Sequence, residues 1–417
     1  MSMTKHMMSK DLTALIITPE PAWPVMNGWD ARNYQLIRAM AGFSKFDVVT
    51  LAHPVLHIDQ KETCDKLKAR SLTVIRHSPP SYVLTALKSL ITSEPMGPLL
   101  FRSEGLHSTV AALSARNRYD VCLILGNLCM AEYAADAQAL MHVLDMCDDV
   151  AHYYDRRALI AGNGPARAFY RGQAKMLRSY LRRESLGFNR ILAICELDAN
   201  SIAQEVDVPV VSVPNCVDSR HFRPAQSGAS VPHDPLLLFV GSMDYWPNRD
   251  AVDWFTSSVM PRILQKNPDT RLQLVGPGTK QFTSVSPSVV LRGFVENLAA
   301  EYRACDVFVC PIRVGTGIKN KLMEALASGC AIVSTDIGIE GLALRNGEHL
   351  LIANDPIEFA HAVNSLLCDS ALRTRLGNAA RAYAEEALSE GISCNLLRAA
   401  MLPNDSVDVL SSDLKSV

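Results

Sequence analysis

A glycine-rich turn, followed by two lysines and a glutamate, holds the residues of this chain best suited to bind a ligand. Gly315 and Gly317 come directly after an apolar run at residues 307–310. Because they lack a Cβ, both glycines let the backbone turn tightly and approach a ligand closely. Lys319 and Lys321 add positive charge beside the start of the helix predicted next, where free backbone N–H groups suit an anion.

Glu324 lies one turn into that helix, roughly where a carboxylate can accept hydrogen bonds from ribose hydroxyls. Glycine-rich turns also recur by chance in α/β proteins. The glycines alone therefore leave an ordinary turn as an open alternative.

One strand–helix–strand unit positions these residues. The apolar run at 307–310 is predicted to be a buried strand, and residues 331–334 form the next one. Gly329 ends the intervening helix where a left-handed residue is favoured. That helix has an apolar face at helical spacing, made of Leu322, Met323, Leu326 and Ala327.

Strands and helices alternate along the whole chain, which predicts parallel, doubly wound sheets. In the first half the predicted strands are residues 12–18, 46–51, 72–75, 121–125, 142–144 and 191–195. In the second half they are residues 236–240, 272–275, 289–291, 307–310, 331–334 and 349–352. No G-x-G-x-x-G follows the first strand of either half, which argues against an NAD-dependent enzyme.

Two places in the first half are candidates for ligand contacts. The Pro- and Gly-rich loop after residues 12–18 leads into a helix near Asp30, at the strand end where open α/β sheets bind ligands. Gly28 and Arg32 are its candidates, with a solvated helix residue as the alternative for Arg32.

Just past residues 142–144, a cluster of polar side chains can act as a general base or can be a polar loop with a helix cap. It comprises Asp145, Asp148, Asp149 and His152, of which Asp148 and His152 are the catalytic candidates.

Residues 156–183 contain many basic side chains and no Asp or Glu. Aromatic and aliphatic residues are interleaved at roughly helical spacing. A basic amphipathic helix of this kind contacts an anionic membrane surface or a lipid-diphosphate acceptor. The alternative is a surface helix whose apolar face packs on its own domain.

Length and composition limit the number of domains and the classes of partner. A chain of 417 residues is too long for one ordinary core, so two domains or more are expected. The net charge of −2 does not indicate binding to nucleic acid. No apolar run approaches the roughly 18 residues that cross a bilayer, and no signal peptide is seen. The eleven scattered cysteines indicate buried, reduced residues of a cytoplasmic protein, and the dispersed histidines indicate no metal site.

Several ordered motifs carry a resemblance to a known family. The stretch GTGIKNKLMEALASG at 315–329 resembles the donor-site signature of retaining glycosyltransferases of family 4, the group 1 transferases of the GT-B fold. It is most similar to a bacterial subgroup with a GxGIKNK motif. The similarity extends to FVGSMDYWPNRDA at 239–251, LVGPG at 274–278 and LRGFV at 291–295.

The resemblance implies two Rossmann-like domains facing a central cleft. Residues 1–213 would bind the acceptor and residues 214–389 the donor, and residues 390–417 would be a helix returning to the first domain plus a loose tail. Donor contacts are implied for Gly28, Arg32, Gly241, Ser242, Gly293, Phe294, Gly315, Gly317, Ile318, Lys319, Asn320, Lys321 and Glu324. Asp148, His152 and Glu324 are the candidate catalytic residues, of which Asp148 and His152 are proposed from their place past a strand end and not from the resemblance.

Two departures from the family pattern concern charge. The loop after the first strand of the second domain lacks the family's Arg and Lys and has SMDYWPN at 242–248 instead. The first Glu of the family's E-x7-E pair is also missing, which leaves Glu324. Lys319 and Lys321 are the expected replacements for the missing positive charge, since charge-assisted contacts to phosphate are strong.

The predicted activity is transfer of a sugar, with retention, from a nucleotide diphosphate donor to a hydroxyl of a glycan or lipid-linked glycan. No metal or other cofactor is expected, and the place of action would be the cytoplasm, on or near the inner face of the membrane. The resemblance suggests cell-surface or exopolysaccharide assembly. The alternatives are a non-catalytic nucleotide-sugar or acceptor-binding module and a sugar-nucleotide epimerase on the same fold.

Overall fold

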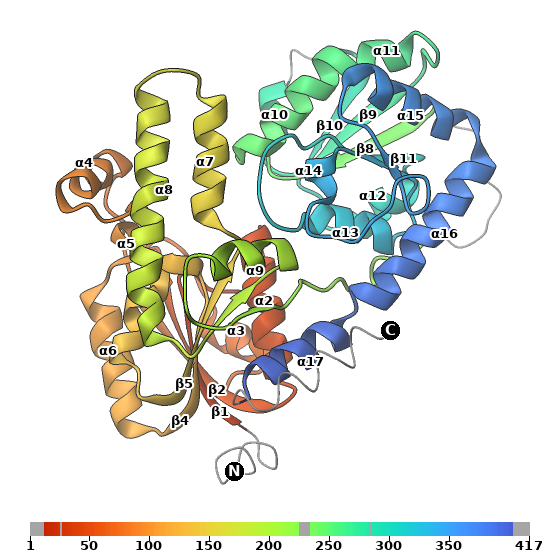
Figure 1. Cartoon of the computed structure of the whole chain (residues 1–417). Helices are drawn as coiled ribbons and strands as arrows, with labels where there is room; N and C mark the ends of the chain where they lie inside the picture. Colours follow the sequence, from red (N-terminus) through yellow and green to blue (C-terminus); the bar gives the residue numbers. More distant parts are fainter. Residues whose placement is uncertain (1–11, 26, 225–233, 283–285, 403–417) are drawn as a thin grey trace. The chain divides into compact units, whose positions relative to one another are not determined.

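The computed structural model describes residues 12–25, 27–224, 234–282 and 286–402 (Figure 1). Its contacts divide the chain into two compact units. Unit 1 comprises residues 1–215 and 393–417, and unit 2 comprises residues 216–392. Residues 225–233 lie outside the described part of the chain, and so do residues 403–417, where the loose tail was expected.

Unit 1 contains a parallel sheet of seven strands in the order β3-β2-β1-β4-β5-β6-β7. The strands are β1 Leu12–Thr18, β2 Ser44–Ala52, β3 Ser71–Arg76, β4 Tyr119–Ile124, β5 Ala139–Cys147, β6 Arg190–Ala193 and β7 Val210–Ser212. The helices are α2 Gly28–Met40, α3 Gln60–Leu67, α4 Tyr82–Thr92, α5 Met96–Phe101, α6 Glu104–Arg116, α7 Val150–Ile160, α8 Pro165–Glu184, α9 Glu196–Ala203 and α17 Glu390–Ala400. Two 3-10 segments, η1 Asn127–Asp136 and η2 Ser185–Gly187, complete the unit.

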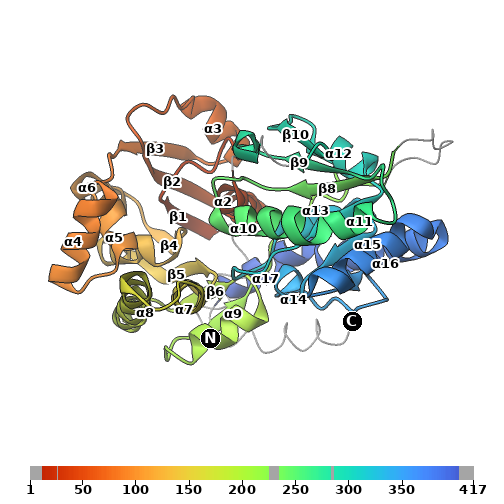
Figure 2. The same cartoon turned by 90° about the horizontal axis from the view of Figure 1, so that it is seen from above.

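Unit 2 contains a parallel sheet of six strands in the order β10-β9-β8-β11-β12-β13. The strands are β8 Leu236–Val240, β9 Arg271–Val275, β10 Val289–Gly293, β11 Val307–Cys310, β12 Ile332–Ser334 and β13 Leu351–Ile352. The helices are α10 Trp246–Trp254, α11 Met260–Leu264, α12 Leu298–Ala304, α13 Asn320–Ala327, α14 Asp336–Ile339, α15 Pro356–Cys368 and α16 Ser370–Ala387. A π-helical turn, η3 Phe255–Val259, joins α10 to α11, and η4 Thr279–Phe282 follows β9. Figure 2 shows both sheets with helices on their faces.

Both faces of the unit 1 sheet are buried, as parallel strands require. Leu15 and Ile17 of β1 belong to one apolar core, while Ala14 and Ile16 belong to the other. Successive side chains of a strand point to opposite faces, so the continuous apolar run of β1 fills both cores. The fold class expected from the alternation of strands and helices is therefore confirmed.

Several local predictions were wrong because tertiary contacts moved the element boundaries. β5 extends to Cys147, so Asp145 lies inside a buried strand and not past its end. The basic segment is divided between α7 and α8 by a turn at residues 161–164. β7 was not predicted.

The C-terminal helix α17 is bound to unit 1. The Arg190 guanidinium in β6 donates to the carbonyl oxygens of Ala400 at 2.6 Å and Leu402 at 3.1 Å. Ser393 Oγ donates to the Pro214 carbonyl oxygen at 2.9 Å. Among the described residues no cysteine forms a disulfide, and Cys368 is exposed, contrary to the expectation that the cysteines are buried. In the described part of the chain no helix is long and apolar enough to cross a membrane.

Candidate donor site in unit 2

The residues singled out in the second half meet where the strand order of the unit 2 sheet reverses. β8 and β11 are neighbours in the sheet although they are far apart in sequence. The loop after β8 contains Gly241 and Ser242, and the loop after β11 contains the glycine-rich turn. Because ligands of open α/β sheets bind outside the carboxyl ends of strands at such a switch point, this is the candidate site.

The turn before α13 depends on its glycines. Gly315 has φ +136° and Gly317 has φ +68°, conformations that a side chain with a Cβ strains to adopt. Lys319 Nζ donates to the carbonyl oxygen of Gly317 at 2.6 Å and lies 3.7 Å from Glu340 Oε2. Lys319 therefore braces the loop, and its charge is already paired with a carboxylate. Ile318 is buried, and Asn320 begins α13.

Lys321 points back to the loop after β8. Its Nζ donates to Asn248 Oδ1 at 2.6 Å and lies 4.4 Å from the centre of the Phe239 ring. The surrounding protein desolvates the ammonium and lowers the pKa of Lys321 to about 8. A cation held in a partly buried site, with a neutral amide as its hydrogen-bond partner, is suited to bind an incoming phosphate.

Asn248 and Gly276 complete this arrangement, and sequence reasoning did not single them out. Asn248 Nδ2 donates to the Ser242 carbonyl oxygen at 2.7 Å, so one amide links Lys321 to the loop. A Cβ at Gly241 would lie 2.7 Å from Lys321 Nζ, and one at Gly276 would lie 2.1 Å from the Gly241 carbonyl oxygen. The Gly276 contact is with backbone, so close packing requires a glycine there, whereas a Cβ at Gly241 would displace the ends of the Lys321 and Asn248 side chains. The sequence signal for Asn248 was its place in the SMDYWPN loop.

Glu324 accepts a hydrogen bond at 2.8 Å from the hydroxyl of Tyr302, a buried residue that the sequence did not indicate. Burial raises the pKa of Glu324 to about 7, against the smaller opposing effects of the Tyr302 hydrogen bond and the Lys321 charge. Near neutral pH, the carboxyl group therefore exchanges between a donor and an acceptor of hydrogen bonds.

The raised pKa of Glu324 predicts a pH-dependent stability of unit 2. Glu324 makes its full contribution to the free energy of unfolding below pH 4.5, its ordinary pKa. That contribution is lost as the pH rises through about 7, the pKa in the folded state. We expect Glu324→Gln to raise the free energy of unfolding above pH 7 by about 1–3 kcal/mol and to change it little below pH 4.5. Urea denaturation at a series of pH values measures this. Parallel profiles for variant and wild type would contradict the assignment.

The loop after β10 supplies an exposed aromatic ring. Gly293 has φ +70°, and its carbonyl oxygen accepts a hydrogen bond at 2.7 Å from the backbone N–H of Gly276. Phe294, the next residue, is 69% exposed. An exposed ring beside a fixed backbone turn is suited to stack on a nucleotide base.

The unit 1 candidates occupy two different strand ends. Gly28 begins α2 and is exposed, and the preceding Asn27 caps this helix. Arg32 is 2% exposed, so the alternative of a solvated helix residue is wrong. Its guanidinium donates to the Asp145 carboxylate at 2.5 Å and to Asn215 Oδ1 at 2.9 Å. A donor contact of Arg32 stays a prediction.

Asp148 and His152 both lie where β5 passes into α7. The His152 backbone N–H donates to Asp149 Oδ1 at 3.0 Å, which makes Asp149 the helix cap. Asn127 Nδ2 donates to the Asp148 backbone carbonyl oxygen at 3.3 Å. Both candidates are partly exposed, and their catalytic role stays a prediction. In the described residues no group of three His, Cys, Asp or Glu side chains is arranged to hold a metal ion.

Comparison with known families gives a match over unit 2. The model of the family described as "Glycosyl transferases group 1" matches residues 234–369. This part of unit 2 is therefore similar to group 1 glycosyl transferases. It includes Gly241, the glycine-rich turn, Lys321 and Glu324. This match identifies the family described above and does not distinguish the GxGIKNK subgroup within it.

Known proteins similar to the chain share parts of its sequence and its whole fold. An "uncharacterized 44.6 kDa protein in cps region" of Klebsiella pneumoniae is 31% identical over 144 residues, 32% of this chain and 37% of that protein. The phosphatidyl-myo-inositol mannosyltransferase of Mycobacterium tuberculosis (strain CDC 1551 / Oshkosh) is 28% identical over 206 residues, 45% of this chain and 54% of that protein. The chain thus spans roughly a third to a half of the length of these relatives.

The fold is that of a GT-B protein. The crystal structure of Anabaena Alr3699/HepE in complex with UDP aligns with 97% of this chain and 100% of that one, at a TM-score of 0.63 and 13% identity. At this identity the likeness concerns the fold alone.

Proposed function

We propose that this chain is a retaining glycosyltransferase that moves a hexose from a nucleotide diphosphate donor to a hydroxyl acceptor in surface glycan or exopolysaccharide assembly. The observation that carries the proposal is the convergence of Lys321, Asn248 and Gly241 beside the start of α13, within the group 1 region. The Klebsiella relative from a cps region and the mycobacterial mannosyltransferase support a role in surface glycans.

Each part of the donor has a proposed partner in unit 2. The diphosphate lies against the N-terminal amides of α13 and the Lys321 ammonium, which stabilise the charge that grows as the sugar leaves. The ribose hydroxyls bond to Glu324, and the base stacks on Phe294. UDP is the first nucleotide to test, because the HepE structure contains it. The similarity to the GxGIKNK subgroup is part of this proposal.

Transfer breaks the bond between the anomeric carbon and the diphosphate oxygen and forms one to the acceptor oxygen. The acceptor proton passes to a base, for which Asp148 and His152 are proposed. We assign residues 1–213 to the acceptor and residues 214–389 to the donor. A glycan or lipid-linked glycan is the proposed acceptor, met at the cytoplasmic face of the membrane.

Thermal melting of the full chain with UDP, GDP, ADP and their sugar conjugates tests donor binding. A ligand that binds only the folded state raises stability by RT ln(1 + [L]/Kd), about 2.7 kcal/mol at 100 times Kd. We expect one base to raise the melting temperature with both the diphosphate and the sugar nucleotide. No shift with any of them would contradict the proposal.

Sugar transfer needs a second measurement, with donor and lipid-linked acceptors from cells. Donor binding without transfer would favour a non-catalytic nucleotide-sugar module. The loop at 242–248 that lacks Arg and Lys, and the missing first Glu, favour that alternative. Transfer with retained anomeric configuration, read by NMR, would exclude it.

A further inference from the structure

A carboxylate from the loop after β12 reaches the glycine-rich turn of unit 2. Glu340 directly follows α14, and its Oε2 lies 3.7 Å from Lys319 Nζ. The same ammonium donates to the Gly317 carbonyl oxygen at 2.6 Å. The side chains of Lys319 and Glu340 are only 9% and 12% exposed. The turn therefore carries a carboxylate and an ammonium that are largely withdrawn from water.

Close packing fixes the segment that carries Glu340. Thr335 Oγ1 accepts a hydrogen bond at 3.0 Å from the backbone N–H of Gly338 and donates to the Ile312 carbonyl oxygen. A Cβ at Gly338 would lie 2.9 Å from the Cys310 carbonyl oxygen. The short helix α14 thus packs directly on the end of β11, and backbone contacts hold Glu340 beside the turn.

Open space borders the turn at Gly315. Gly315 is buried, yet a Cβ built on it would have no atom of the described residues within 4 Å, its chain neighbours aside. A glycine with open space on this side lets a ligand approach the backbone directly. The turn that Lys319 braces therefore has room for part of a ligand.

The strand order places Glu340 at the sugar end of the proposed donor. Along the carboxyl edge of the sheet the strands follow one another as β10, β9, β8, β11 and β12. With its base on Phe294 after β10 and its diphosphate at Lys321, between β8 and β11, the nucleotide runs along this edge. The sugar is bonded to the diphosphate on the side away from the nucleoside. It therefore falls beyond β11, where the loop after β12 supplies Glu340.

The chemistry of the Lys319–Glu340 pair suits hydroxyl groups. A carboxylate accepts hydrogen bonds on both oxygens, and an ionised acceptor makes them roughly twice as strong as a neutral one does. The ammonium offsets the charge of the carboxylate, whereas the Lys321 ammonium is bonded to the neutral amide of Asn248. A phosphate is thus favoured at Lys321, and an uncharged group rich in hydroxyls is favoured at Glu340.

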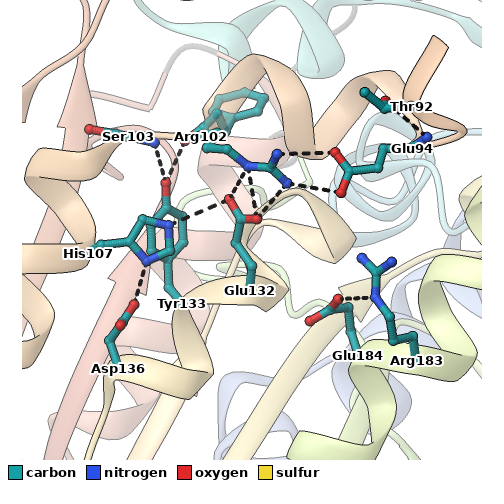
Figure 3. Close-up of polar contacts among 11 residues, drawn as sticks. Thr92, Glu94, Arg102, Ser103, His107, Glu132, Tyr133, Asp136, Arg183 and Glu184 are labelled. Carbon is teal, nitrogen blue, oxygen red and sulfur yellow. Dashed lines mark hydrogen bonds and ion pairs between the residues drawn. The ribbon is translucent and has the colours of Figure 1, made fainter. Parts of the chain in front are cut away.

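A carboxylate network of unit 1 has a different character (Figure 3). The Arg102 guanidinium lies 3.1 Å from Glu94 Oε2 and 2.8 Å from Glu132 Oε2. His107 Nδ1 lies 2.5 Å from Asp136 Oδ2 in the same network. These contacts tie α6 and the segment before it to η1, so they brace unit 1. A carboxylate paired with a cation therefore marks a binding site only where other features of a site accompany it.

We propose that Glu340 binds the hydroxyl groups of the donor sugar. Residues 311–323, which comprise the turn and the start of α13, contain no Asp or Glu, so the carboxylate for the sugar comes from the next loop. Lys319 is a positioning residue, because its ammonium contacts both the turn and the Glu340 carboxylate. This role of Glu340 rests on the proposed function, since the sugar is part of the same donor.

Calorimetry that compares a diphosphate with its sugar nucleotide tests this role. The probes are UDP with UDP-glucose and GDP with GDP-mannose, and the pair that the wild type binds more tightly is used. We expect Glu340→Gln to weaken binding of the sugar nucleotide by about tenfold or more, and to leave the diphosphate within about threefold of the wild type. Glu348→Gln is the matched control, because Glu348 pairs with Arg345 at 3.0 Å in the same unit and is 48% exposed. It should change neither affinity.

Glu340→Asp keeps the negative charge and shortens the side chain by a methylene group. It should bind the diphosphate as the wild type does and lose part of the affinity for the sugar nucleotide, and it decides the question if Glu340→Gln does not fold. An equal loss of both ligands would make Glu340 a structural residue of the turn. Diphosphate binding with an unchanged affinity for the sugar nucleotide would overturn this role alone. If the wild type bound neither diphosphate, the proposed function would fall together with it.

Discussion

Lys321→Met is expected to weaken binding of the nucleoside diphosphate by about 10- to 150-fold, the loss of a charge-assisted contact of about 1.5–3 kcal/mol. The loop after β8 carries SMDYWPN where the family has Arg and Lys, and Lys321 Nζ is held at that loop by Asn248. Calorimetry with the diphosphate identified by melting measures the change. The exposed Lys266→Met in the same unit is the control and should bind as the wild type does.

The same lysine predicts a pH dependence. Because the pKa of Lys321 is lowered to about 8, the ammonium is lost as the pH rises through 8. Affinity for the diphosphate should therefore fall above pH 8, towards tenfold per pH unit, and binding there should take up a proton. Lys321→Arg keeps its charge and should bind with a flatter profile. An unchanged affinity in Lys321→Met, or a wild-type affinity that does not fall above pH 8, would contradict the phosphate role.

Arg32→Met is expected to lower the free energy of unfolding of unit 1 by about 3–5 kcal/mol, because it leaves the Asp145 carboxylate charged and buried. Arg32 and Asp145 are 2% and 1% exposed and are joined at 2.5 Å. Nη1 also donates to the Val213 carbonyl oxygen at 3.0 Å, so one guanidinium links α2, β5 and the end of the unit 1 sheet. Urea denaturation followed by hydrogen exchange in residues 12–215 measures the loss.

The double variant Arg32→Met/Asp145→Leu separates pairing from packing. With both charges removed, most of the stability should return. Arg271→Met removes one partner of the exposed pair with Asp234, whose atoms lie 3.1 Å apart, and should cost at most about 1 kcal/mol. If Arg32→Met lowered the free energy of unfolding no more than Arg271→Met does, Arg32 would not be a structural residue. That result would favour its predicted contact with the donor.

The sequence predicted the fold class and the positions of the loops proposed for the donor because their signals are local. The strands Leu12–Thr18, Leu236–Val240 and Val307–Cys310 have the predicted bounds, since a short apolar run between polar loops suits a buried parallel strand. Gly329 has φ +68°, as a helix-ending glycine should. Gly315 and Lys321 could likewise be found from their spacing in one strand–turn–helix unit.

Other features depend on contacts between residues far apart in the chain. Asn248 meets Lys321 across 73 positions and Arg32 meets Asp145 across 113, distances over which one sequence carries no pairing signal. α4 has an ordinary amphipathic pattern, and only the position of α8 decided that its polar side is buried. Local sequence determined the strands, the turns and the group of residues that we propose to bind phosphate. The tertiary structure decided which side chains are desolvated and paired, because burial and charge pairing arise only when distant segments pack together.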